Sequence, residues 1–390
     1  MLEDDLRKML HEWADQGLLR HVRETQSPQG PTIQFDGRQV HNFCSNDYLG
    51  LANDSRLGQS IVNSIRQEGY GAAASRLLCG SMPSHHRLER EMARFKGTEA
   101  CLLYSTGFMA NQGILTSLFG KDDVIFSDRL NHASIIDGIR LSGASFHRYR
   151  HVDMDHLDRL LTAAPPAQRK CIVTDTVFSM DGDLAPLDRI VELAGKYQAM
   201  VMVDEAHAMG VMGDTGKGCC EHFGVADRVE IQMGTFSKAA GSFGAYCCGS
   251  RNLIDVLVNK SRSFIYTTGL PPLVAAASLK AVEIIERDQA HRNKLWDNTH
   301  YTRAALRLAG FNTMDSSTPI IPILVGDNEK AVTFSRRLFE EGILVLAIRP
   351  PTVPPGTARL RMTVTAKHNK ADIDYVLNRM QNIGKELQVI

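Results

Sequence analysis

The chain has 390 residues and a formal net charge of +0, with 43% hydrophobic and 23% charged residues. This balance is typical of a globular protein, and the length predicts two or three structural units at roughly 150 residues each. A nucleic-acid-binding protein normally carries a basic excess or a basic stripe, and the sequence has neither, so we expect no nucleic-acid partner.

The first twenty residues, MLEDDLRKMLHEWADQGLLR, predict an amphipathic helix and a mature start rather than a targeting segment. Apolar residues recur at helical spacing, as at Leu2, Leu6 and Trp13. A secretory signal needs a basic start followed by an apolar run, and a membrane helix needs roughly 20 apolar residues. Neither pattern is present, so we expect a cytoplasmic protein that does not enter a membrane.

The eight cysteines are interpreted as buried, reduced thiols rather than metal ligands. No two of them have the C-x-x-C spacing of a zinc ribbon, and most lie within apolar runs such as AYCCGS, which contains Cys247 and Cys248. Such thiols are typical of a reducing compartment. We expect no metal site.

The middle of the chain alternates short apolar runs with helix-like segments. The runs predict strands at 100–104, 124–126, 171–174, 199–203 and 245–248. Apolar residues on consecutive positions are typical of strands buried on both faces of a parallel sheet. Between them, residues 187–197 predict a helix that begins just after Pro186. We therefore predict a large α/β domain over residues 46–280, with a mainly parallel sheet flanked by helices.

The pattern changes after about residue 275. A long, highly charged stretch at 276–308 predicts one helix, and it is followed by predicted strands at 320–325, 344–348 and 359–364 and predicted helices at 329–341 and 370–387. This mixture predicts a smaller C-terminal α+β domain over residues 281–390. Residues 1–45 are expected to form an N-terminal segment with a helix and a short strand.

Asp204 follows an apolar strand in the sequence MVDEAH, which also contains His207. Open α/β sheets bind ligands at the carboxyl ends of their strands. A carboxylate there pairs with a protonated ring nitrogen and keeps a pyridinium cationic, which makes the ring a strong electron sink. His207 is then placed to hydrogen-bond a ring substituent. Two other interpretations stay open: Asp204 as a helix cap, and both residues as metal ligands, although no partner cluster accompanies them.

Lys238 lies in the segment GTFSKAAG, away from other cations. A lysine that forms a Schiff base must spend time as the free amine, and partial desolvation lowers its pKa. Thr235 and Ser237 offer hydroxyl groups to a phosphate. A lysine in such a loop, taken alone, is more often a solvated turn; the Asp204 segment upstream favours the functional interpretation.

Two further segments indicate a function only when they are considered together with the Asp204 and Lys238 segments. STGFMAN at 105–111 follows a predicted strand and opens a helix, where free backbone N–H groups bind phosphate and Gly107 permits close approach. DRLNHAS at 128–134 contains His132, an imidazole that is suited to cover a flat ring. Strand–glycine–helix turns are common, and an isolated histidine is more often structural.

Taken in order, these segments resemble the α-oxoamine synthase family of fold-type I enzymes that depend on pyridoxal 5'-phosphate (PLP). The resemblance covers nearly the whole chain and includes five further stretches: NFCSNDYLGL at 42–51, VFSMDG at 177–182, YTTGLPP at 266–272, AIRPPTVP at 347–354 and GTARLR at 356–361. It implies a fold-type I transferase fold, PLP as the cofactor, and a homodimer with active sites at the subunit interface.

The resemblance implies a role in PLP chemistry for five residues. Lys238 would hold the cofactor as a Schiff base, and Asp204 would pair with the pyridine nitrogen. His207 and Ser179 would contact the phenolic oxygen. His132 would stack on the ring and take part in proton transfer.

The resemblance also implies which residues bind the phosphate group. Gly107, Phe108 and Thr235 would contact it from within the chain. Thr267 or Thr268 would reach the same group from the partner subunit.

On the substrate side, the resemblance implies that Arg361, helped by Asn46, clamps the amino-acid carboxylate as a bidentate fork. Arg20 would face the distal carboxylate of the acyl chain, and Thr352 would also contact substrate. The segment GYGAAASR at 69–76 departs from the family, because alanines stand where many relatives have glycine. Its likeness to a dinucleotide-binding motif is discounted, since it follows a helix-like segment and not a strand.

The implied reaction is the decarboxylative condensation of L-alanine with an acyl thioester, pimeloyl-CoA or its carrier-protein equivalent. The RPPTVP stretch at 349–354 favours alanine over glycine as the amino acid. Three alternatives are retained: a glycine-using synthase of the same family, an aminotransferase with the same fold and cofactor, and a protein that keeps the architecture without the activity.

Overall fold

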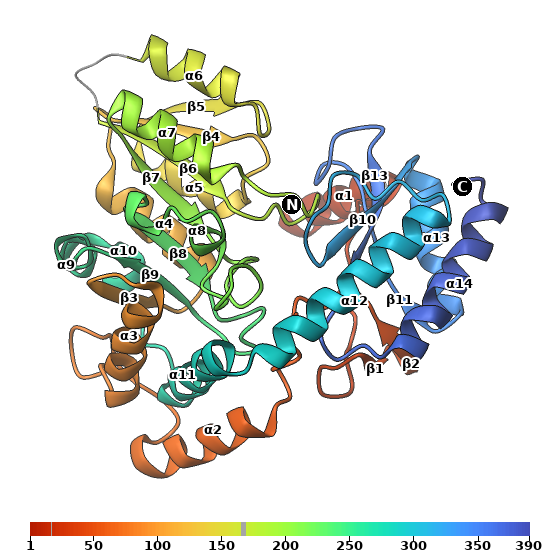
Figure 1. Cartoon of the computed structure of the whole chain (residues 1–390), viewed down its shortest axis with the longest axis horizontal. Coiled ribbons are helices and arrows are strands. Elements are labelled where there is room, and N and C mark those ends of the chain that lie inside the picture. Colours follow the sequence, from red (N-terminus) through yellow and green to blue (C-terminus); the bar gives the residue numbers. More distant parts are fainter. Residues whose placement is uncertain (17, 165–168) are drawn as a thin grey trace.

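The structure is a computed structural model that describes residues 1–16, 18–164 and 169–390 (Figure 1). Its largest element is a seven-stranded sheet in the order β3-β9-β8-β7-β6-β4-β5. The bounds of these strands are β3 Ala100–Tyr104, β4 Val124–Asp128, β5 Ser145–Tyr149, β6 Lys170–Asp175, β7 Ala199–Asp204, β8 Ile231–Thr235 and β9 Ala245–Gly249. Within this sheet β9 runs antiparallel to both of its neighbours, and the other strands share one direction.

Helices cover both faces of the sheet, as the continuous apolar strands predict. Along β3, Leu102 packs into one hydrophobic cluster, whereas Cys101 and Leu103 pack into another on the opposite face. The first face carries α4 (Gly107–Leu118), α5 (Ala133–Ser142), α9 (Arg251–Lys260) and α10 (Arg262–Ile265). The second carries α2 (Ser55–Glu68), α3 (Pro83–Lys96), α6 (Met154–Ala163), α7 (Leu187–Tyr197), α8 (Cys219–His222) and α11 (Pro272–Arg287).

The parallel strands end in polar residues at one edge of the sheet. Asp175 ends β6 and Asp204 ends the neighbouring β7, and the two are partners in the strand register. Thr235 ends β8 on the other side of β7. This edge is where open α/β sheets bind ligands.

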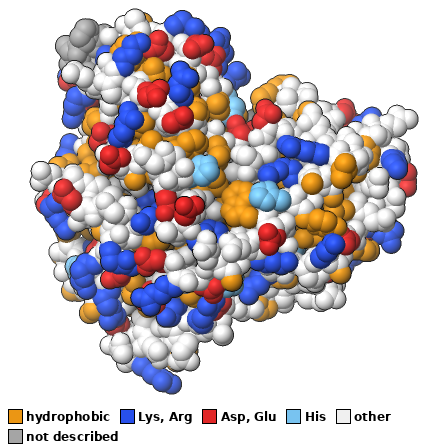
Figure 2. Space-filling view, viewed as in Figure 1, with side chains coloured by type: hydrophobic (Ala, Val, Ile, Leu, Met, Phe, Trp, Pro, Cys, Tyr) orange, Lys and Arg blue, Asp and Glu red, His pale blue; other side chains and the backbone are white. Residues whose placement is uncertain are grey.

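The C-terminal part forms a second lobe around a three-stranded antiparallel sheet in the order β10-β13-β12. Its elements are α12 (Gln289–Leu308), β10 (Ile320–Gly326), α13 (Asn328–Glu340), β12 (Leu346–Ile348), β13 (Ala358–Thr363) and α14 (Lys370–Glu386). The two lobes meet at a furrow in which hydrophobic side chains gather (Figure 2). The fold class predicted from the sequence, a mainly parallel sheet with flanking helices and a smaller α+β part, is confirmed.

Two predicted elements of this lobe are wrong in detail. The single helix at 276–308 is two helices, because Asp288 leaves the helical region (φ −111°, ψ 83°) and its carboxylate accepts a hydrogen bond from Arg56 at 3.2 Å. The strand at 344–348 is split: β11 (Ile343–Leu344) pairs with β2, whereas β12 pairs with β13. Val345, between them, is buried in the core of the lobe.

The N-terminal segment contributes α1 (Leu2–Asp15), β1 (Thr32–Phe35) and β2 (Arg38–Asn42). The predicted amphipathic helix is present, and its apolar side chains are exposed, Leu2 at 73% and Trp13 at 44%. β2 pairs with β11, so this segment joins the C-terminal lobe. The domain boundaries at residues 45 and 280 stay a prediction. Among the described residues, no helix has the length and apolar character to cross a membrane.

Candidate active site

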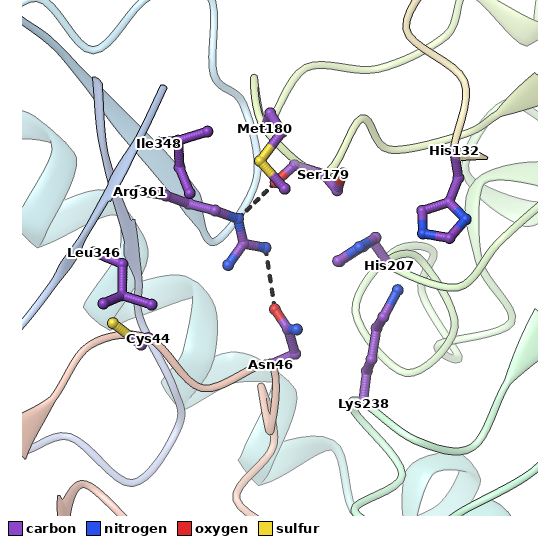
Figure 3. Close-up of a pocket in the computed structure, with 10 residues that line it drawn as sticks. All are labelled: Cys44, Asn46, His132, Ser179, Met180, His207, Lys238, Leu346, Ile348 and Arg361. Atoms are coloured by element: carbon purple, nitrogen blue, oxygen red, sulfur yellow. Dashed lines mark hydrogen bonds between the residues drawn. The ribbon is translucent and has the colours of Figure 1, made fainter. Parts of the chain in front are cut away.

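Two adjoining cavities open at the carboxyl edge of the large sheet. The first, about 210 Å³ and here called the sheet-edge cavity, is lined mainly by residues that end or follow the strands. The second, about 310 Å³ and here called the interlobe cavity, is lined by residues of both lobes (Figure 3). Four residues line both cavities: His132, Ser179, His207 and Lys238. All four are residues that the sequence analysis singled out.

Lys238 follows β8, and its amine points toward His207 across the cavity from Arg361 (Figure 3). Burial lowers the pKa of the amine to about 8. The carboxylates of Asp204 and Asp175 act in the opposite direction, and the Arg361 guanidinium lowers the pKa further. A substantial fraction of the amine is therefore neutral near pH 8, the form in which it is a nucleophile or a base.

Asp204 presents a buried carboxylate at the floor of the sheet-edge cavity, with an exposed fraction of 5%. Its Oδ1 accepts from the backbone N–H of Ala206 at 2.9 Å, and its Oδ2 accepts from Asn111 Nδ2 at 2.8 Å. Asp175 lies on the adjacent strand and lines the same cavity. Burial, and secondly the charge of Asp204, raise the pKa of Asp175 well above its usual range. The cavity therefore contains the hydrogen-bonded carboxylate of Asp204 beside the carboxyl group of Asp175, whose raised pKa favours its protonated form.

His132 and His207 face the cavities from different elements. His132 caps the start of α5, and its Nδ1 lies 2.8 Å from Ser134 Oγ. His207 Nδ1 lies 2.6 Å from the hydroxyl of Tyr48, which is 1% exposed. Burial lowers the pKa of both imidazoles, and the charge of Lys238 adds to this effect. Both rings are therefore neutral at neutral pH.

The start of α4 provides a site suited to an anion. Thr106 caps the helix by accepting from Met109 N at 3.1 Å, and Gly107 and Phe108 follow at the cavity wall. A side chain at Gly107 would approach Met233 Cε to 3.2 Å, so glycine keeps this wall open. Thr235 and Ser237 lie opposite, with their hydroxyls 3.0 Å apart. Free N–H groups at a helix start and nearby hydroxyls bind phosphate.

Arg361 reaches the interlobe cavity from β13 and is only 8% exposed. It donates from Nε to the backbone oxygen of Ser179 at 2.6 Å and from Nη2 to Asn46 Oδ1 at 3.0 Å (Figure 3). Its Nη1 donates to Thr363 Oγ1 at 3.1 Å. A guanidinium has more N–H groups than these bonds use. The remaining ones are available to a carboxylate in the cavity.

Four predicted residues lie outside these two cavities. Thr267 and Thr268 line a separate small pocket beside Arg76. Thr352 is exposed and lines a larger cavity of about 770 Å³ that adjoins at Ser179. Arg20 is exposed in a segment without regular structure. Their functional roles stay predictions.

Several residues that the fold brings into the site were not predicted from the sequence. Asp175, Asn111, Ser134 and Tyr48 all contact or neighbour the predicted residues. A signal existed for Asp175, because the run CIVTD ends in aspartate just as MVMVD does at Asp204. The others sit on helices or in a loop, where their position depends on tertiary packing. Among the described residues, no group of three His, Cys, Asp or Glu side chains is arranged to hold a metal ion.

The sequence profile of aminotransferase class I and II matches residues 38–380. The 8-amino-7-oxononanoate synthase of Geobacter sulfurreducens is 49% identical over 383 residues, which cover 98% of each chain. That of Symbiobacterium thermophilum is 48% identical over 390 residues, which cover 100% of each chain.

Solved structures of two related enzymes also match this chain. A serine palmitoyltransferase structure with a PLP internal aldimine matches with a TM-score of 0.94 and 31% identity, covering 99% of this chain and 98% of that one. The 8-amino-7-oxononanoate synthase of Francisella tularensis matches with a TM-score of 0.78 and 30% identity, covering 89% of this chain and 98% of that one.

The lowered pKa of Lys238 predicts a distinct pH dependence of its reactivity. Burial disfavours the protonated amine, so the neutral fraction rises as the pH increases through about 8. Competitive acetylation of the cofactor-free protein, followed peptide by peptide by mass spectrometry, should give a midpoint near 8 for Lys238. Exposed lysines in the same sample serve as the control and should titrate near about 10.4. A midpoint for Lys238 that coincides with theirs would contradict the buried setting of the amine.

Proposed function

This chain belongs to the aminotransferase class I and II family, and within it to the α-oxoamine synthases; we propose that it is an 8-amino-7-oxononanoate synthase. It would condense L-alanine with pimeloyl-CoA, or the carrier-protein thioester, to give 8-amino-7-oxononanoate, coenzyme A (or the free carrier protein) and carbon dioxide. The single observation that carries the proposal is the half-buried Lys238 amine, which faces a cavity with a fixed carboxylate, Asp204, on one side and Arg361 on the other.

The residues of the sheet-edge cavity fit PLP. The cavity combines a lysine of lowered pKa, a buried carboxylate and a helix start with adjacent hydroxyls, which match an aldehyde, a ring nitrogen and a phosphate. Asn111 Oδ1 is buried and has no hydrogen-bond partner among the described residues, as expected where a ligand is to be bound. PLP is the cofactor of this enzyme class, and Lys238 is the residue proposed to hold it.

When bound, PLP supplies an electron sink for negative charge that develops at the amino-acid Cα. Asp204 would accept a hydrogen bond from the protonated ring nitrogen, and its own orientation is fixed by the N–H groups of Asn111 and Ala206. The neutral amine of Lys238 is the proposed base that takes the Cα proton at Nζ. Its pKa of about 8 makes both proton uptake and proton release accessible near neutral pH.

The remaining polar groups orient the cofactor. We assign His207 and Ser179 to its phenolic oxygen, because both line the wall shared by the two cavities. The Tyr48 hydroxyl, 2.6 Å from His207 Nδ1, holds the His207 ring in place, and burial raises the pKa of this phenol to about 12, so it stays protonated. The phosphate contacts are assigned to Gly107, Phe108 and Thr235.

The interlobe cavity is the proposed amino-acid site. Arg361 would bind the alanine carboxylate, and Asn46 holds the guanidinium in place. Cys44, Leu346 and Ile348 lie on the same side of the cavity as Arg361 and would give an apolar surface beside the bound amino acid (Figure 3). His132 lines the other end of this cavity, and its proposed role is to stack on the cofactor ring.

In this proposal the acyl thioester reaches the site through the larger cavity that adjoins the interlobe cavity. Thr352 lies on the adjoining 770 Å³ cavity, which meets the interlobe cavity at Ser179 and Met180. Arg20 remains the proposed partner of the distal carboxylate. Its exposed position leaves it accessible to a substrate that reaches the site from the N-terminal side.

A homodimer is the proposed assembly. Large apolar side chains are exposed in the segments around Thr267 and Thr268 and in the loop that packs against them, with Tyr70 at 76%, Leu78 at 80% and Tyr266 at 72%. Gly269 contacts this loop through Ala74 O at 2.9 Å. Such exposure is typical of an interaction surface. All eight cysteines are free thiols, which supports a location in the reducing cytoplasm.

The proposed activity is tested by a thioester screen with the purified protein, in which product masses are measured with alanine and with glycine. We expect alanine and pimeloyl thioester to give 8-amino-7-oxononanoate, with release of thiol and carbon dioxide. The Lys238→Ala variant is the control for PLP-independent turnover. A preference for glycine with acetyl-CoA would identify a glycine-using synthase instead, and amino-group exchange without thiol release would identify an aminotransferase.

Shared active sites predict that two inactive variants restore activity when mixed. Lys238→Ala and the double variant Thr267→Ala/Thr268→Ala damage opposite halves of each site. A mixed dimer therefore contains one intact site and should show roughly half the wild-type activity per dimer. Each variant measured alone is the control. No recovery in mixed dimers, verified by two affinity tags, would place the threonines outside the partner's site.

A further inference from the structure

A row of four side chains connects the floor of the sheet-edge cavity to His132. Asn111 Nδ2 lies 2.8 Å from Asp204 Oδ2 and 2.9 Å from Ser134 Oγ, and Ser134 Oγ lies 2.8 Å from His132 Nδ1. Asn111 and Ser134 are each 1% exposed. Bulk water therefore does not compete for these hydrogen bonds. Which atom donates and which accepts is set by the protein groups.

The charge of Asp204 fixes the direction of the first two bonds. A carboxylate only accepts hydrogen bonds, so the Asn111 atom that faces it is the donor Nδ2 and not Oδ1. The same nitrogen uses its second hydrogen toward Ser134 Oγ. Ser134 Oγ is therefore an acceptor from Asn111.

The direction of the third bond follows. The single hydroxyl hydrogen of Ser134 is left free to donate, and the atom within reach is His132 Nδ1. The backbone N–H of Ser134 points to the same nitrogen at 3.3 Å. Two donors that converge on Nδ1 require it to be an acceptor without a hydrogen of its own.

We propose that Asn111 and Ser134 are positioning residues that transmit the polarity of Asp204 to His132 and hold its imidazole as the Nε2–H tautomer. This inference rests on the proposed function for its catalytic meaning. The tautomer itself is a property of the chain and can be measured without any substrate.

The fixed tautomer restricts what His132 can do in the reaction. Nδ1 is engaged with Ser134, so Nε2 is the nitrogen left for the cavities that the ring lines. A neutral ring that already carries hydrogen on Nε2 donates a hydrogen bond there and does not accept a proton there. His132 thus acts as a donor to a bound carboxylate or carbonyl oxygen, and the Cα proton is left to Lys238.

The groups around the ring support its neutral form. Burial lowers the pKa of His132, and the positive charge of Lys238 lowers it further, whereas Asp204 and Asp137 raise it. At pH 7.5 the ring is therefore neutral, and its tautomer is defined.

The test is a proton-coupled NMR measurement on full-length, PLP-loaded protein with ¹⁵N-labelled histidine, at pH 7.5. The His132 signals are identified by their loss in His132→Asn. In the wild-type protein we expect the imidazole hydrogen of His132 to be on Nε2. Hydrogen on Nδ1 would overturn the inference while leaving the proposed reaction intact, because the reaction is scored separately by product mass.

Asn111→Asp is the matched polarity reversal. An oxygen then faces both Asp204 and Ser134, and the two neighbouring carboxyl groups share one proton. The serine hydroxyl turns to donate to this oxygen, and Ser134 Oγ becomes an acceptor for a hydrogen on His132 Nδ1. The ratio of Nδ1–H to Nε2–H should rise roughly tenfold, as expected for the exchange of one hydrogen bond. Asn63→Asp, on the exposed face of α2, is the control and should leave the His132 spectrum unchanged.

Ser134→Ala removes the hydroxyl that connects Asn111 to His132, and together with Asn111→Asp it forms a double-mutant cycle. In that background Asn111→Asp should no longer alter the tautomer. An unchanged tautomer in the single Asn111→Asp variant, or an equal shift with and without the serine hydroxyl, would refute transmission through Ser134. If Asn111→Asp fails to fold, Ser134→Ala alone tests transmission: it should lower the Nε2–H preference of His132, and an unchanged preference would refute the role of the serine hydroxyl.

Discussion

The amine of Lys238 is held between opposing electrostatic influences. Burial and the Arg361 guanidinium favour the neutral amine, whereas Asp204 and Asp175 favour the ammonium form. The balance leaves the pKa at about 8, close to working pH. A more polar pocket would leave the amine protonated and unreactive, and a pocket without Asp204 would lose the partner for a protonated ring nitrogen. The arrangement of the surrounding residues follows from keeping this balance.

The site lies where the two lobes meet, and Arg361, one of the groups that affect the pKa of Lys238, comes from β13 of the smaller lobe. The loop that contains Ser179 is held from β13 by Arg361, which donates to the Ser179 oxygen, and by Arg359, which donates to Asp181 at 2.6 Å. On the other side, His151 bridges Asp128 and Asp183, which raises the pKa of its imidazole to about 10 and keeps it cationic. The proposed carboxylate-binding residue, Arg361, therefore also joins the two lobes.

Much of the large domain was predictable because its local and tertiary signals agree. The strand at 100–104 and the helix at 187–197 have the predicted bounds, and β7 delivers Asp204 to the expected edge. The break at Asp288 was not predictable from composition, since no glycine or proline marks it and a distant arginine, Arg56, binds there. The switch of sheets at Val345 likewise depends on which partner strand is nearby.

The site residues also fall into those that the sequence could predict and those that it could not. Lys238, Asp204 and His207 lie in sequence segments whose residue types already indicate their chemistry. Asn111 and Tyr48 are ordinary helix and loop residues until the fold sets them beside Asp204 and His207. A sequence pattern cannot assign such residues, because their function depends on a hydrogen-bond partner 93 or 159 positions away.

The most direct measurement of the account is reductive trapping of the cofactor. Purified protein is loaded with PLP, reduced with borohydride, digested, and mapped by mass spectrometry. The account predicts one phosphopyridoxyl group per chain, on the peptide that contains Lys238. A label on any other lysine, or no label after verified loading, would contradict it.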